Sequence, residues 1–142
     1  VEVPRFAAAV KRWGDRLLDR IFTPVERAYC DARRRRDAHY AARFAAKEAT
    51  AKALGTGITG DVSWRDIEGG RDAAGAPQMA LRRGAAKRAR ALGARRALVS
   101  LSHTESVALA SVLLVGEGAV DKFRAPASAR PSLRRRRSEA TR

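Results

Sequence analysis

The segment from Arg43 to Gly57 holds the residues whose types and spacing are best suited to chemistry. Glu48 and Lys52 are four positions apart, so they share one face of a helix. A carboxylate is a hard oxygen ligand of the kind that binds Mg²⁺, and a nearby lysine can neutralise phosphate charge or orient an attacking hydroxyl. The same spacing also fits an ordinary surface ion pair worth about 0.3–0.5 kcal/mol. Spacing alone leaves both interpretations open.

His103 is the second candidate, within the segment Val99–Glu105 at the predicted end of a strand. Histidine titrates near neutrality, so an imidazole there could donate to a phosphate or a hydroxyl group. The alternative is a turn histidine without a role. His39, the other histidine, has no supporting pattern, and we predict that it lies on a helix surface.

Basic side chains form the third feature, because the net charge is +15 and residues 1–118 alone carry +9. A basic body implies an anionic partner, which could be nucleic acid, an acidic membrane surface, an acidic protein or a phosphorylated ligand. The arginines and lysine of the first predicted helix are either a solvated face or a surface that steers an acidic partner into contact.

Helices are predicted to position these residues in the first half of the chain. Apolar residues recur every three or four positions over 4–20 and form one stripe, which predicts an amphipathic helix. The members of this stripe are Phe6, Val10, Trp13, Leu17 and Ile21. Thr23, Pro24 and Glu26 fit the capping box of a second helix that runs to about residue 36. A third helix is predicted over 38–54, ended by Gly55.

The second half of the chain is typical of strands. Alternation predicts a strand over 62–68, and a turn over 72–77 followed by a strand over 78–81 predicts a hairpin. A short helix over 84–92 precedes two strands, 97–102 and 107–115, and the unbroken apolar run of the latter predicts a central strand. The fold class is therefore α+β, with N-terminal helices packed on a small, mainly antiparallel sheet.

Composition limits the remaining possibilities. We predict one folded domain over 1–118 and a basic, disordered tail over 119–142 that contains the run Arg134–Arg137. Alanine-rich composition predicts a thin core that oligomerisation would help to bury. Cys30 is the single cysteine and is predicted to be a semi-buried helix residue, which excludes an internal disulfide. We find no signal peptide and no apolar run long enough to span a bilayer, which favours a cytoplasmic protein.

Several blocks, in the right order and spacing, together resemble the carrier-protein synthase type of phosphopantetheinyl transferase, the holo-[acyl-carrier-protein] synthase family. The resemblance runs from Val1 to about Gly116. The segments that carry it are Val1–Phe6, Arg20–Glu26 (R-I-F-T-P-V-E), Arg43–Gly57 (R-F-A-A-K-E-A followed by K-A-L-G-T-G), Trp64–Glu68 with Gly75 and Pro77, and Ser100–His103 (S-L-S-H).

The resemblance implies a reaction and a set of partners. Phosphopantetheine would pass from coenzyme A to a serine of an acidic acyl carrier protein, with Mg²⁺ bridging the pyrophosphate, and adenosine 3′,5′-bisphosphate would leave. The enzyme would serve fatty acid biosynthesis as a homotrimer with sites shared between subunits.

The resemblance also assigns roles to individual residues. Glu48 would be the metal ligand, and Lys52 and His103 would act with it in catalysis. The coenzyme A site would be lined by Arg43, Phe44, Lys47, Lys52, Gly55, Pro77 and His103. The carrier protein would dock on Arg5, Arg12 and Arg16.

Two points set limits on this interpretation. The family carries a second metal ligand, an aspartate, which the alignment places two positions before Val1 and which this sequence lacks. We expect it to belong to the full-length protein. A basic nucleic-acid-binding module is the rival interpretation, resting on the charge, the run Arg33–Arg36 and the tail, but no recognisable reading motif supports it.

Overall fold

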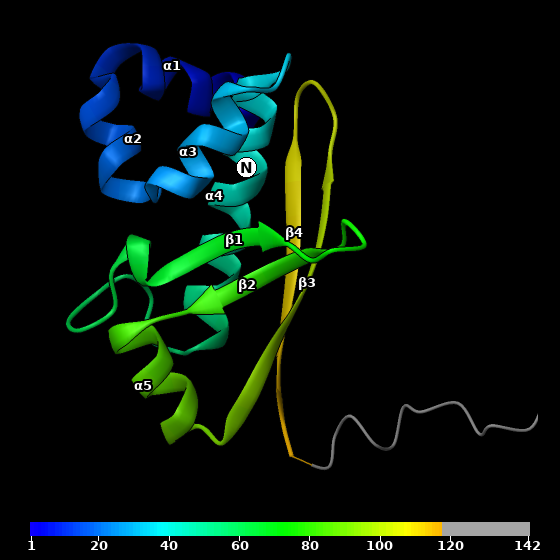
Figure 1. The fold of residues 1–142 in the computed structure, drawn as a ribbon. Helices are drawn as coiled ribbons and strands as arrows, with labels where there is room; N and C mark the ends of the chain where they lie inside the picture. The colour runs from blue at the N-terminus through cyan, green and yellow to red at the C-terminus, as the bar shows by residue number, and fades with distance from the viewer. Residues whose placement is uncertain (118–142) are drawn as a thin grey trace, which may run out of the picture.

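The structure is a computed structural model that describes residues 1–117, so the predicted tail lies outside the described residues. Five α-helices, one 3₁₀-helix and two antiparallel hairpins make up this region. In chain order the elements are α1 (Val3–Trp13), α2 (Asp15–Ile21), α3 (Pro24–Asp31), α4 (Arg36–Ala53), η1 (Trp64–Asp66), β1 (Ile67–Arg71), β2 (Pro77–Leu81), α5 (Arg83–Ala91), β3 (Ala94–His103) and β4 (Ala108–Gly116). The α+β class predicted from the sequence is confirmed (Figure 1).

The single helix predicted over 4–20 is wrong, because the chain breaks at Gly14 into α1 and α2. Gly14 adopts a φ of 59°, a conformation that glycine tolerates far better than other residues. The break ends the apolar stripe as well. Phe6, Leu18 and Ile21 are buried, whereas Trp13 is 58% exposed.

The start of α3 follows the prediction. The Thr23 hydroxyl accepts from the Glu26 N–H at 3.3 Å, and a Glu26 carboxylate oxygen accepts from the Thr23 N–H at 2.9 Å. Pro24 occupies the first turn. The helix ends at Asp31, five residues before the predicted end, and a turn leads into α4, which ends at Ala53 as the sequence indicated.

Two strand predictions need correction. Residues 62–66 are not a strand but a loop and η1, and the strand begins only at Ile67. Among the described residues, β4 pairs with β3 along its length and meets the N-terminus only at its start, where Val1 and Ala108 exchange two backbone hydrogen bonds. Most of β4 is therefore the edge of a two-stranded sheet rather than a central strand. One face of β4 is uncovered, with Leu109 and Leu113 each 61% exposed.

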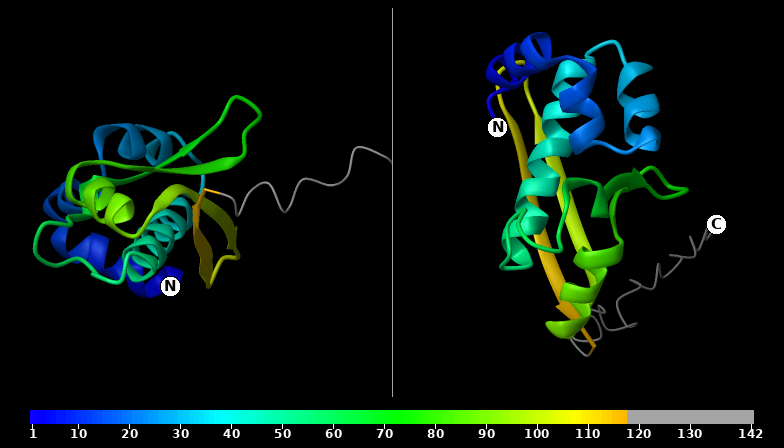
Figure 2. Two further views of the ribbon diagram at one scale, coloured as in Figure 1. Left: turned by 90° about the horizontal axis from the view of Figure 1, so that it is seen from below. Right: turned by 90° about the vertical axis from the view of Figure 1, so that its left-hand side faces the viewer.

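Helix α4 is the centre of the fold. It runs along the β3–β4 hairpin, with α1, α2 and α3 gathered at one end and the β1–β2 hairpin crossing over its middle (Figures 1 and 2). Its buried residues are mostly alanines, which let neighbouring elements approach closely. The first core cluster lies under α1–α4 and contains Phe22 and Tyr40, and the second lies between α4, the hairpins and α5.

Candidate functional site

The segment singled out in the sequence forms the second half of α4 and the turn that follows it. Helix geometry turns each residue about 100° from the previous one, so adjacent Lys47 and Glu48 face different surroundings. Lys47 is completely buried, whereas the side chain of Glu48 is 41% exposed. Lys47 therefore lies in the core and Glu48 at the surface, although they are adjacent in the sequence.

Lys47 is bonded within the protein core. Its Nζ atom lies 2.8 Å from Glu26 Oε2 and donates to the carbonyl oxygens of Trp64 and Ile67 at 3.0 and 2.5 Å. Glu26 Oε1 in turn accepts from the Gly69 N–H at 2.7 Å. Burial lowers the pKa of Lys47, and the neighbouring Glu26 opposes that shift. With its ammonium group enclosed and bonded within the protein, Lys47 ties α3, α4 and β1 together, and its expected contact with coenzyme A stays a prediction.

Glu48 and Lys52 share one helix face, as their spacing predicted, and they form a solvent-facing ion pair. Glu48 Oε1 lies 3.1 Å from Lys52 Nζ, and the Lys52 side chain is 74% exposed. An exposed pair of this kind adds little to stability, so both groups can exchange their mutual contact for a ligand at small cost.

A groove of about 600 Å³ lies beside Glu48. Its floor is apolar and its rim is charged. The lining residues are Val1, Glu2, Arg5, Phe6, Ala9, Leu17, Ile21, Phe44 and Glu48. Phe44 is half-buried, and its ring lies 5.2 Å from the ring of Phe6 and 5.0 Å from that of Trp64. The groove thus brings together Glu48, Phe44 and Arg5, three of the predicted site residues.

Arg43 lies on another side of α4, in a cluster of arginines around Tyr29. The guanidinium carbon of Arg43 is 3.9 Å from the centre of the Tyr29 ring, and those of Arg33 and Arg71 are 4.2 and 5.8 Å away. Arg71 Nε also donates to the Tyr29 hydroxyl at 3.1 Å. Arg43 is only 6% exposed, and its Nε has no hydrogen-bond partner among the described residues. These guanidinium groups concentrate positive charge at one place.

His103 ends β3, as predicted, and stands next to this cluster. Its ring lies 5.2 Å from that of His39, which in turn lies 5.9 Å from the ring of Tyr29. Burial, then the charge of His103, lowers the pKa of His39. The prediction of an unremarkable surface histidine missed this contact, because His39 and His103 are far apart in the sequence and only the fold brings them together.

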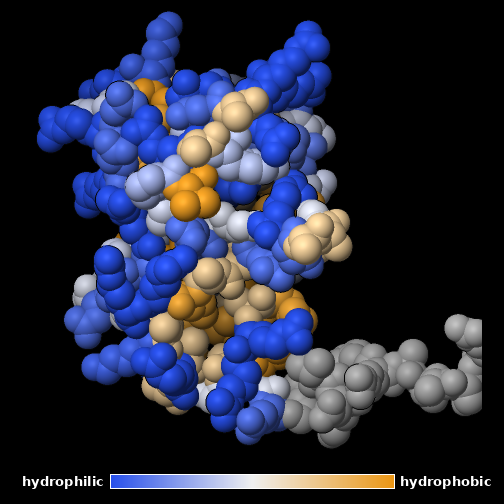
Figure 3. Space-filling model, viewed as in Figure 1, coloured by the Kyte–Doolittle hydropathy of each residue, from blue (hydrophilic) through white to orange (hydrophobic). Residues whose placement is uncertain are grey.

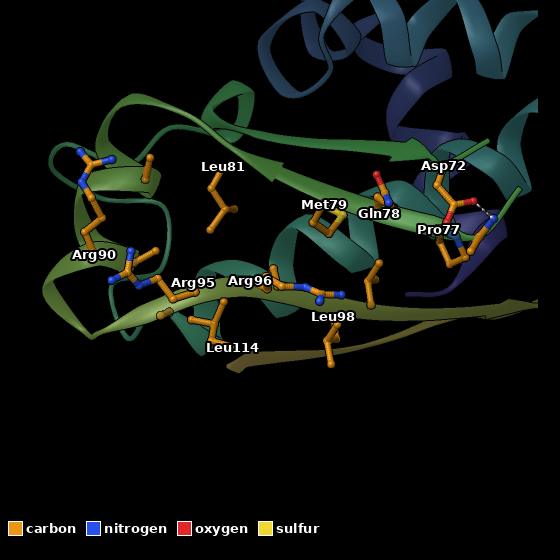
Figure 4. A pocket seen from close by; sticks show the side chains of 16 residues that line it. Asp72, Pro77, Gln78, Met79, Leu81, Arg90, Arg95, Arg96, Leu98 and Leu114 are labelled. Carbon is orange, nitrogen blue, oxygen red and sulfur yellow. Dashed lines mark hydrogen bonds between the residues drawn. The ribbon is translucent and has the colours of Figure 1, made fainter. Parts of the chain in front are cut away.

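Pro77 and Gly55 occupy two further places. Pro77 begins β2 opposite Arg71, and it also lines a cavity of about 560 Å³ between the β1–β2 hairpin, α5 and β3 (Figure 4). Figure 3 shows apolar surface gathered in this region. Gly55 follows α4 with a φ of 74°, and Gly57 has a φ of 62°, so both need the freedom of glycine.

Arg5, Arg12 and Arg16 are all exposed, as a docking surface requires. Arg5 and Arg12 belong to α1, but Arg16 follows the break at Gly14 and belongs to α2. Arg12 lies over the ring of the exposed Trp13 at 4.9 Å, which gives this surface an apolar as well as a cationic component.

Two features are absent from residues 1–117, the part of the chain that the structure describes. No group of three or more histidine, cysteine, aspartate or glutamate side chains is arranged to hold a metal ion there. No helix in the same range is long and apolar enough to cross a bilayer.

The predicted site residues therefore fall into two groups. The groove group is Arg5, Phe44 and Glu48, with Lys52 bonded to Glu48. The arginine–aromatic cluster is Arg43, Arg33 and Arg71 around Tyr29, with His39 and His103 beside it. The groups share no contact between their charged side chains among the described residues.

The exposed Glu–Lys pair beside a groove and the separate cationic cluster are features suited to a protein that binds phosphate groups. The family model of the 4′-phosphopantetheinyl transferase superfamily matches residues 1–109, and the chain belongs to this superfamily. The resemblance noted in the sequence is thereby confirmed.

Individual relatives agree with this assignment. A holo-[acyl-carrier-protein] synthase of Koribacter versatilis is 53% identical over 114 residues, which cover 80% of this chain and 91% of the relative. The crystal structure of the Neisseria meningitidis holo-[acyl-carrier-protein] synthase is 38% identical, with a TM-score of 0.74 over 81% of this chain and 92% of that one. The Helicobacter pylori synthase in complex with coenzyme A is 29% identical, with a TM-score of 0.71 over 81% and 95%.

Proposed function

We propose that this protein is a holo-[acyl-carrier-protein] synthase, which transfers the 4′-phosphopantetheine arm of coenzyme A to a serine of apo acyl carrier protein and releases adenosine 3′,5′-bisphosphate. The observation that carries the proposal is the exposed Glu48–Lys52 pair beside the groove, within a chain whose relatives bear that name. A cytoplasmic location stays a prediction.

The reaction exchanges one phosphorus–oxygen bond for another. The serine oxygen of the carrier protein bonds to the β-phosphorus of coenzyme A, the bond from that phosphorus to the bridging oxygen breaks, and the serine proton leaves. Lys52, exposed on the last turn of α4, is placed to hold a phosphate oxygen and to assist the departure of the proton. Positioning and electrostatic stabilisation supply most of the rate in such phosphoryl transfers.

Glu48 is the proposed ligand of Mg²⁺. An exposed carboxylate whose partner is one exposed lysine can turn to a cation, and Mg²⁺ typically takes one or two carboxylates together with substrate phosphates. Glu48 can therefore supply one protein ligand of a Mg²⁺ site. When bound, the ion neutralises charge on the transferred phosphate.

The arginine–aromatic cluster is the proposed site for further phosphate charge of coenzyme A. Arg43 and His103 were predicted there, and Tyr29, Arg33 and Arg71 join them in space. Since the cluster and the groove group are separate in one chain, we propose that the site forms between neighbouring subunits of a homotrimer. The uncovered leucines of the β3–β4 hairpin support this arrangement, because burial would favour their contact with another copy.

Arg5, Arg12 and Arg16 are the proposed docking residues for the acidic carrier protein. Their exposure and charge suit an acidic helix, and opposite potentials raise the rate of encounter. Arg5 also borders the groove beside Glu48, so a carrier bound there would bring its serine toward the proposed metal ligand.

The direct test is incubation with apo carrier protein, coenzyme A and Mg²⁺, followed by intact mass. We expect the carrier to gain the mass of one phosphopantetheine group and Glu48→Ala to abolish that gain. Near-normal turnover by Glu48→Ala would rule out the metal assignment.

A mixing experiment tests the shared site. Glu48→Ala and His103→Ala chains are each expected to be inactive. If neighbouring subunits complete one site, unfolding and refolding the two variants together restores part of the activity. Two inactive variants that stay inactive after mixing, in a verified trimer, would place the whole site within one chain.

A further inference from the structure

The turn that follows α4 is contacted by a side chain from a distant element. Arg88, in α5, donates from Nε to the carbonyl oxygen of Leu54 at 2.9 Å. A Cβ placed on Gly55 would lie 3.6 Å from Arg88 Nη2, so the guanidinium group lies along the turn. Leu54 is the C-cap residue of α4, and Gly55 follows it.

Local hydrogen bonds also hold this turn. The Gly55 N–H donates to the Lys52 carbonyl oxygen at 3.0 Å, and the Gly57 N–H donates to that of Ala51 at 3.2 Å. The hydroxyl groups of Thr56 and Thr59 donate to the carbonyl oxygens of Gly57 and Thr56 at 2.9 and 2.8 Å. The bond from Arg88 differs from these in coming from a distant element and in bringing a positive charge to the turn.

The C-terminal end of α4 would repel a phosphate group unless nearby cations offset its negative charge. The C-terminal end of a helix carries about half a negative charge, from carbonyl groups that have no partner within the helix. Lys52 supplies one cation in the last turn of α4. Arg88 supplies a second, and within residues 1–117 no carboxylate lies in salt-bridge range of it.

The position of Arg88 is set by the packing of its own helix. Ala85 and Ala89 are buried in the second core cluster, where α5 packs on β2, β3 and η1. This packing leaves Arg88 beside the turn. Arg90 belongs to the same helix but is exposed, and it lines the cavity beside β3 instead of contacting the turn. α5 thus offers two arginines of equal charge in different settings.

We propose that Arg88 is a positioning residue for the coenzyme A phosphates: it fixes the Leu54–Gly57 turn and offsets the negative end of α4 where Lys52 binds the substrate. This inference rests on the proposed function, in which Lys52 holds a phosphate oxygen of coenzyme A. Arginine suits the task because one edge of its planar guanidinium group can donate to a carbonyl oxygen while the whole group keeps its charge beside the turn.

The experiment compares Arg88→Gln with Arg90→Gln, both as full chains. We expect Arg88→Gln to raise the KM for coenzyme A about tenfold and to weaken coenzyme A binding in calorimetry by a similar factor, as the loss of a charge-assisted contact predicts. The KM for carrier protein should stay within about twofold. Arg90→Gln should leave all three values within about twofold.

Stability and the proposed site are checked in parallel. If Arg88→Gln melts below the assay temperature, Arg88→Lys replaces it, and its KM for coenzyme A must still exceed that of Arg90→Gln. Lys52→Ala serves as the reference variant. If Lys52→Ala raises the KM for coenzyme A but Arg88→Gln does not, the role of Arg88 is refuted alone; if Lys52→Ala has no effect, the proposed phosphate site falls and this inference falls with it.

Discussion

Glu26–Lys47 and Glu48–Lys52 are two glutamate–lysine pairs whose lysines lie five residues apart on α4. In the first pair both side chains are completely buried, the charged atoms are 2.8 Å apart, and backbone groups satisfy the remaining bonding capacity. In the second the atoms are 3.1 Å apart and the side chains are 41% and 74% exposed. The same two residue types thus stabilise the fold in the Glu26–Lys47 pair and remain available to a ligand in the Glu48–Lys52 pair.

The difference follows from desolvation. A buried charge has lost its water, so its partner and its hydrogen bonds must replace that water completely. An exposed charge keeps its water, so its partner is dispensable. The two pairs should therefore respond to mutation in opposite ways, the first in stability and the second in activity.

The largest effect is expected when the buried pair loses one member. Lys47→Met leaves the Glu26 carboxylate buried without its cation, and we expect a loss of about 3–5 kcal/mol in the free energy of unfolding. Denaturant titration measures this loss. A loss below about 1 kcal/mol in the free energy of unfolding would show that water reaches the Glu26–Lys47 pair.

The Cys30 thiol offers an independent readout of the same variant. Burial raises the pKa of this thiol to about 12, so it is protonated and slow to react in the native protein. Because Cys30 is fully buried and lies on α3 with Glu26, labelling by a thiol reagent should accelerate in Lys47→Met as the core opens more often.

A smaller effect is expected when both members are replaced by apolar residues. Glu26→Leu with Lys47→Met removes both charges, but it also removes the α3 cap and the acceptor of the Gly69 N–H. We expect a loss of about 1–2 kcal/mol, clearly less than for Lys47→Met alone. Equal losses in the two variants would mean that the unpaired carboxylate is not the cause.

The docking surface should give an effect on one substrate only. Arg12→Glu with Arg16→Glu should raise the KM for carrier protein about tenfold, equivalent to about 1.4 kcal/mol, because the steering potential is reversed. The KM for coenzyme A is the control. Equal changes for both substrates would argue against a docking role.

The smallest effect on stability is expected for the exposed pair. Glu48→Ala should change the free energy of unfolding by no more than about 0.5 kcal/mol, even though it abolishes transfer. Denaturant titration under the conditions used for Lys47→Met makes the two values comparable. A loss as large as that of Lys47→Met would place Glu48 among the structural residues.

The sequence predicted local features well because their causes are local. The capping box of Thr23 and Glu26 and the end of α4 before Gly55 depend on neighbouring residues, and both are present in the structure. The shared helix face of Glu48 and Lys52 followed from helical spacing alone.

Features that depend on distant neighbours were harder to predict. Lys47 is adjacent to Glu48 in the segment Arg43–Gly57. It is a core residue only because α3 and β1 pack on one side of α4. The central place predicted for β4 rested on its apolar run, but within the described chain its second side is paired only at Ala108, by Val1. The edge-to-face contact between the rings of His39 in α4 and His103 in β3 joins residues 64 positions apart, and no local signal marks it.

The proposed association of copies through the uncovered face of the β3–β4 hairpin would make the stability of this protein depend on its concentration. Leu98 and Leu113 face each other across the two strands and are 41% and 61% exposed. If other copies cover this face, association stabilises the folded state by mass action, so the melting temperature rises with protein concentration. A dilute sample and a concentrated one would then differ in stability although every molecule has the same sequence.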